Sequence, residues 1–117
     1  MRQHNEIIDI SRWGKDHWST LLYVESRVVD QGGSIKDDHL RKDGNEYPTR
    51  LAGGAALVGH NDYDCLEDLE AARVIEHTGG TGLHPIYSLT DEGWRVAGLV
   101  RRWKAEGKGI AKFSVAT

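Results

Sequence analysis

Apolar residues recur at three- and four-residue spacing in two long segments of the chain, as they do in amphipathic helices. In residues 16–31, Asp16 stands at the cap position and the glycine pair 32–33 marks the stop. In residues 90–106, Thr90 stands at the cap position and acidic residues follow in the first turn. The apolar positions are Trp18, Leu21, Leu22, Val28 and Val29 in the first segment and Val96, Leu99, Val100 and Trp103 in the second.

The middle of the chain is predicted to hold shorter helices. Leu66, Leu69 and Ala72 form the apolar stripe of a helix over residues 62–73, and Asp64 with Glu67 fits a capping box. Residues 36–42 predict a still shorter helix. The intervening residues 43–61 carry proline and several glycines, so we expect an irregular segment or a helical turn at residues 55–58.

Two short apolar runs, residues 74–77 and 85–89, are typical of strands, and the glycine-rich residues 78–84 between them predict a hairpin tip. Ser34 and Ile35 predict a short extended link. The elements together predict a mostly helical α+β fold with a two-stranded hairpin. We expect one domain over residues 1–117, ending in a basic tail at residues 108–117.

Composition narrows the class of protein. The 117 residues include four Trp, four Tyr and one Cys, and the formal net charge is -3. A single cysteine excludes an internal disulfide and zinc sites built on two or more thiolates. The chain has no apolar run of about 20 residues and no apolar core of a signal peptide near Met1, so we expect a cytoplasmic protein.

The order helix, short strand, helix, helix, hairpin, helix resembles a winged-helix domain. The run Leu66 to Glu76 is similar to a recognition helix entering the first wing strand. The run Tyr87-Ser88-Leu89-Thr90-Asp91-Glu92-Gly93 is similar to the last wing strand and helix start of PadR-like and MarR-like transcription regulators. The resemblance covers Leu66 to Val100 and departs at residues 43–61, because a standard helix-turn-helix has a connection of about three to four residues.

The resemblance implies a DNA-binding, non-enzymatic transcription regulator. Because phosphate contacts come from Lys and Arg, the candidate DNA-binding residues are Lys36, Arg41, Lys42 and Arg50. In the regulators that it resembles, the final helix pairs two subunits, which implies a homodimer. The candidate dimerisation residues are Trp94, Val96, Leu99, Val100 and Trp103.

The charge of the inferred recognition helix favours a second hypothesis. Residues 62–76 hold six acidic residues and one basic residue, whereas residues 94–117 hold six basic residues and one acidic residue. An acidic helix is repelled by DNA, so the chain is alternatively a protein-binding module or a phage-type inhibitor. Such a nucleic-acid mimic, comparable to anti-CRISPR proteins, would occupy a nucleic-acid-binding protein. Its candidate partner-binding face is Asp62, Asp64, Glu67, Asp68 and Glu70.

Other chemistry receives little support from the sequence. His60, Asp62, Asp64 and Cys65 lie close together, but their spacing matches no standard metal site, so we expect no metal and no cofactor. We expect Cys65 to be a partly buried thiol and Trp13 and Trp18 to be core residues rather than a partner-binding pair. No pattern combines a nucleophile, a base and an orienting group, so we expect no enzymatic activity.

Overall fold

The computed structural model describes residues 6–115. In this range it has three α-helices and two separate antiparallel two-stranded sheets, so the expected α+β class is confirmed. The helices are α1 (Lys15–Gln31), α2 (Asp62–Ala71) and α3 (Asp91–Ala105). The sheets pair β1 (Thr49–Arg50) with β2 (Ala56–Leu57), and β3 (Ile75–Gly80) with β4 (Pro85–Leu89).

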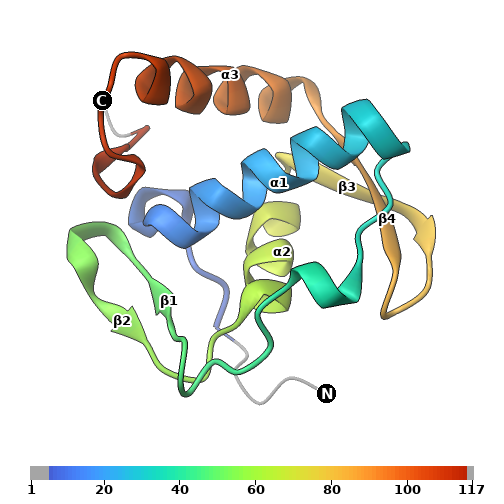
Figure 1. Cartoon of the computed structure of the whole chain (residues 1–117), viewed down its shortest axis with the longest axis horizontal. Helices are drawn as coiled ribbons and strands as arrows, with labels where there is room; N and C mark the ends of the chain where they lie inside the picture. Colours follow the sequence, from blue (N-terminus) through green and yellow to red (C-terminus); the bar gives the residue numbers. More distant parts are fainter. Residues whose placement is uncertain (1–5, 116–117) are drawn as a thin grey trace.

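Helix α1 is the central element, with α3 on one side of it, α2 on the other and a small sheet near each of its ends (Figure 1). Its side chains Trp18, Leu21 and Val24 have no exposed surface. The core also takes Leu69 from α2 and Val100 from α3, both fully buried. The predicted apolar stripes of the helices therefore meet in one core, as burial of a single face of each helix requires, except at Val29 of α1, which is 67% exposed.

A very short extended segment pairs with the hairpin β3–β4. Ser34 forms an isolated antiparallel bridge with Ile86 of β4, so the predicted extended link after α1 lies beside the hairpin. The helix predicted over residues 36–42 is only a 3-10 turn at Asp37–His39. The chain order is thus helix, bridging strand segment, short turn, helix, hairpin, helix, with residues 43–61 lying between the short turn and α2.

The inserted residues 43–61 are more regular than predicted. They contain the hairpin β1–β2, which joins Thr49 to Leu57 and Arg50 to Ala56 in antiparallel register. The expected helical turn at residues 55–58 is wrong, because β2 occupies Ala56–Leu57 and the 3-10 turn lies earlier, at Ala52–Gly54.

The capping residues predicted for α2 and α1 differ from those in the structure. The capping box of α2 joins Asn61 to Asp64, not Asp64 to Glu67: the Asn61 side chain accepts from the Asp64 amide at 3.0 Å and the Asp64 carboxylate accepts from the Asn61 amide at 2.9 Å. Helix α1 starts after Gly14 without a side-chain cap. Asp16 instead accepts the Arg50 amide at 2.6 Å and so holds the inserted hairpin against α1.

Within residues 6–115, no helix combines the length and the apolar character needed to cross a membrane.

Two glycines of α3 give a matched test of the packing. A Cβ at Gly93 would lie 1.8 Å from the backbone oxygen of Val74, whereas a Cβ at Gly98 would find only the flexible end of Arg101, at 3.5 Å. We predict that Gly93→Ala lowers the free energy of unfolding by about 3 kcal/mol through overpacking. Gly98→Ala raises it by up to about 1 kcal/mol through helix propensity. Urea unfolding measures both, and equal stability of the two variants would contradict the close packing of α3 on the Val74 backbone.

Candidate functional site

Three buried polar side chains meet at the centre of the molecule, and we call His17, His60 and Asp68 the Asp68 cluster. None of the three has exposed surface. The Oδ2 atom of Asp68 lies 2.7 Å from Nε2 of His17 and 2.9 Å from Nε2 of His60. Its Oδ1 atom accepts the backbone amide of Ile8 at 3.0 Å. Each oxygen of the buried carboxylate thus accepts at least one hydrogen bond, as burial of a charge requires.

Separate parts of the chain position these side chains. His17 lies in the first turn of α1, where the Trp13 ring stacks on it with a centroid distance of 5.2 Å and an interplanar angle of 4°. His60 directly precedes the Asn61 cap of α2, and its Nδ1 lies 2.7 Å from Oγ1 of Thr49 in β1. The cluster therefore joins α1, α2 and the inserted hairpin.

The protonation of the cluster follows from its surroundings. Burial by itself raises the pKa of Asp68, but the hydrogen bonds from His17, His60 and the Ile8 amide outweigh burial and hold the pKa at about 2. For His17, burial is the larger effect and lowers its pKa despite the nearby carboxylate. At neutral pH the centre of the cluster is a carboxylate, and the His17 imidazole is neutral.

The hydrogen bonds from Thr49 through His60 to Asp68 have the connectivity of a nucleophile, a base and an orienting carboxylate. All three side chains are buried, however, so a substrate has no access to the Thr49 hydroxyl. Cys65 is also fully buried, not partly buried as expected, and burial raises the pKa of its thiol. A protonated, inaccessible thiol is a poor nucleophile, and the hydrogen-bonded chain is a structural link.

Three of the five residues of the predicted acidic face lie inside the protein. Asp62 binds Arg41, Asp64 belongs to the capping box, and Asp68 is the centre of the buried cluster. Only Glu67 and Glu70 are exposed. The acidic face of α2 is therefore narrower than its sequence predicts, because Arg41, the Asn61 cap and the two histidines each cover one of the aspartates.

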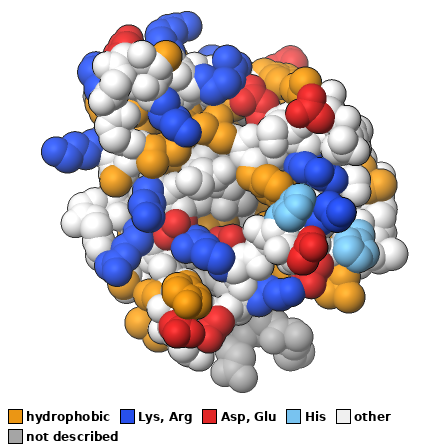
Figure 2. All heavy atoms as spheres, in the orientation of Figure 1, with side chains coloured by type: hydrophobic (Ala, Val, Ile, Leu, Met, Phe, Trp, Pro, Cys, Tyr) orange, Lys and Arg blue, Asp and Glu red, His pale blue; other side chains and the backbone are white. Residues whose placement is uncertain are grey.

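The four candidate DNA-binding residues differ in their surroundings. The Arg41 guanidinium is held between Asp62, at 2.8 Å, and Asp16, at 3.0 Å. Lys42 pairs with Asp37 at 2.6 Å. Lys36 and Arg50 are exposed. In Figure 2, Lys and Arg side chains are scattered over the visible face with acidic residues among them, rather than gathered in one basic patch.

The candidate dimerisation stripe of α3 is largely covered by this same chain. Val96 and Val100 are fully buried, and Leu99 is half-buried against the core. The Trp103 indole donates to the Gly109 carbonyl at 2.7 Å and packs edge-on against a phenylalanine of the C-terminal segment. Trp94, which is 41% exposed, is the part of the stripe left for a partner. Trp13 and Trp18 are both buried, which confirms them as core residues.

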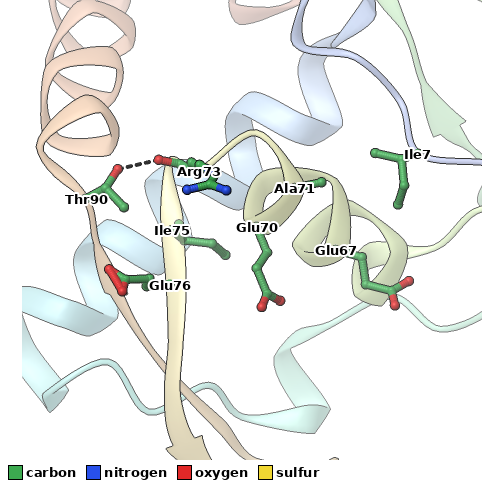
Figure 3. A pocket seen from close by; sticks show the side chains of 8 residues that line it. All are labelled: Ile7, Glu67, Glu70, Ala71, Arg73, Ile75, Glu76 and Thr90. Atoms are coloured by element: carbon green, nitrogen blue, oxygen red, sulfur yellow. Dashed lines mark hydrogen bonds between the residues drawn. The ribbon is translucent and has the colours of Figure 1, made fainter.

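The exposed acidic residues of α2 border two adjoining surface hollows, which we call the acidic trough. The hollows have volumes of about 650 and 550 Å³, and Glu67 and Glu70 line both. Figure 3 shows these two carboxylates projecting from α2 to the same side, with Glu76 on the neighbouring strand β3. Among the described residues that line the two hollows, Arg73 is the single Lys or Arg.

Comparison of the chain with models of protein families, with curated proteins and with solved structures gives no match.

The central role of Asp68 is tested by an isosteric change. We predict that Asp68→Asn lowers the free energy of unfolding by about 3 kcal/mol or more, because the new amide group turns a donor toward two imidazole donors in a closed site. The matched variant Glu70→Gln, on the exposed side of the same helix, changes stability by no more than about 0.5 kcal/mol. Chemical unfolding at neutral pH measures both. A loss below about 1 kcal/mol for Asp68→Asn would contradict this account of the cluster.

Proposed function

We propose that the chain is a non-enzymatic winged-helix protein that binds a partner protein through the acidic trough, and that the partner inserts a basic segment there. The observation that carries this proposal is the charge of the trough, where three exposed glutamates face a single arginine. Such a surface attracts Lys and Arg side chains and repels phosphates.

The order of elements supports the winged-helix part of the proposal. Helix α1 is followed by a strand segment that bridges to β4, then by a short turn, α2, the hairpin β3–β4 and α3. In a winged helix, the position of α2 is that of the recognition helix and the hairpin is the wing. Residues of α2 and of the hairpin β3–β4 line the acidic trough. In winged-helix domains these two elements are the ones that contact DNA.

The residues of the trough determine the kind of partner. Glu67 and Glu70 line both hollows of the trough. The apolar lining includes Ile7 and Ala71 in one hollow and Tyr87 in the other. Burial raises the pKa of Tyr87 to about 12, and the nearby carboxylates of Glu70 and Glu67 add to this effect. A basic segment with apolar residues fits this surface. Nucleic-acid-binding proteins carry such segments, because they must neutralise phosphates, and they are the partner class that we propose.

A synthetic arginine-rich peptide is the probe for the trough. We predict that it binds the chain at low salt and that the double variant Glu70→Lys/Glu76→Lys weakens binding about tenfold, because two attractions become two repulsions. The control Asp30→Lys/Glu46→Lys makes the same change in net charge at exposed positions outside the trough. Fluorescence anisotropy measures the affinities. Equal weakening by both double variants would show a general charge effect and contradict the trough as the site.

DNA binding is the second candidate function, favoured by the order of elements and by the exposed Lys36, Lys42 and Arg50 outside the trough. The proposal predicts no measurable affinity for duplex DNA even at about 50 mM salt, where the electrostatic contribution to binding is strongest. Anisotropy with a labelled duplex measures this. If DNA does bind, and Lys42→Glu abolishes binding while Glu67→Ala does not, the chain is a DNA-binding regulator and the trough is not its functional surface.

A further inference from the structure

We propose that the Asp68 cluster is a zinc site, with Nε2 of His17, Nε2 of His60 and the carboxylate of Asp68 as ligands. These ligand atoms come from α1, from the residue before the α2 cap and from α2, and all lie within 4.8 Å of one another. Two imidazoles and a carboxylate form a common donor set for Zn²⁺. The inference is independent of the acidic trough, since the cluster lies on the inner side of α2.

The distances from Asp68 to the two histidines are close to those that zinc needs. Zn–N and Zn–O bonds of about 2.0–2.1 Å in a tetrahedral site separate the ligand atoms by about 3.3 Å. The two Nε2 atoms lie 2.7 and 2.9 Å from Oδ2 of Asp68, so an outward shift of about half an ångström makes room for the ion between them. Oδ1 of Asp68 accepts the Ile8 amide at 3.0 Å and has a second lone pair, with which it serves as the fourth ligand atom.

The group behind one ligand, His60, already suits a metal-bound histidine, whereas the buried Nδ1 of His17 has no hydrogen-bond partner among the described residues. A histidine that binds metal through Nε2 carries its proton on Nδ1 and donates it to an oxygen acceptor. Oγ1 of Thr49 lies 2.7 Å from Nδ1 of His60, and the same hydroxyl is 3.1 Å from the His60 carbonyl oxygen. In this tautomer His60 donates to Thr49 and Thr49 donates to the carbonyl, so both contacts are satisfied together.

Zinc takes the place of the proton that His60 donates to Asp68 in the metal-free cluster. With the proton on Nδ1, the lone pair of Nε2 points at the Asp68 carboxylate, 2.9 Å away, and a metal ion between the two atoms makes this contact attractive. The same ion binds Nε2 of His17 and neutralises the buried Asp68 charge.

The experiment loads the ion during folding, because no ligand side chain is exposed and binding is coupled to folding in such sites. The full chain is unfolded with a chelator present, freed of it, and refolded with or without equimolar ZnCl₂. We expect one zinc per chain by native mass spectrometry and a rise of about 10 °C in the thermal midpoint, the shift expected for an ion present at about 100 times its dissociation constant. Refolding without uptake of zinc would overturn the proposal.

Cobalt identifies the ligands without a variant that risks unfolding. Refolding the unmodified chain with Co²⁺ is expected to give the intense visible bands of a four-coordinate ion and no thiolate charge-transfer band. A thiolate band would place Cys65 among the ligands and overturn the assigned set. His77→Gln/His84→Gln, which removes two exposed histidines, is expected to retain zinc. Loss of zinc from the His77/His84 variant would show a surface site and overturn the proposal.

Discussion

The Asp68 carboxylate is a negative charge with no contact with water, and this constraint organises the rest of the structure. Transfer of a carboxylate to a protein interior is prohibitive unless donors surround it. The donors are His17, His60 and the Ile8 amide, which lie 51, 8 and 60 residues away in the sequence. Formation of the core thus requires α1, the segment before it and the insertion to dock on α2 together.

Helix α2 carries acidic residues on two sides, and the two sides have different roles. Asp62, Asp64 and Asp68 are buried and hold Arg41, the helix start and the histidines, whereas Glu67 and Glu70 border the trough. Net charge along the sequence adds these residues together, although only the exposed ones act on a partner. The electrostatic case against DNA binding therefore depends on two glutamates of α2 and on Glu76 of β3, not on the whole acidic run.

The sequence predicts the main elements because their signals are local. The apolar spacing around Leu21, Leu69 and Val100 locates the three helices, and glycines locate the β3–β4 tip. Elements held by distant contacts escaped prediction: β1 and β2 have two residues each and are stabilised by pairing and by the Asp16–Arg50 bond. The Asp68 cluster escaped for the same reason. His17 lies in an aromatic run and His60 near Cys65, and no spacing rule connects either with Asp68.

The insertion at residues 43–61, between the Asp37–His39 turn and α2, also supplies one of the three side chains of the Asp68 cluster. Residues 43–61 bring Thr49 and His60 to Asp68, and Arg50 of the same hairpin is bound by Asp16 of α1. Without these residues, the Asp68 carboxylate would retain only His17 and the Ile8 amide. The insertion is therefore part of the core rather than an appended loop. By holding the inner side of α2, it fixes the orientation in which Glu67 and Glu70 face the trough.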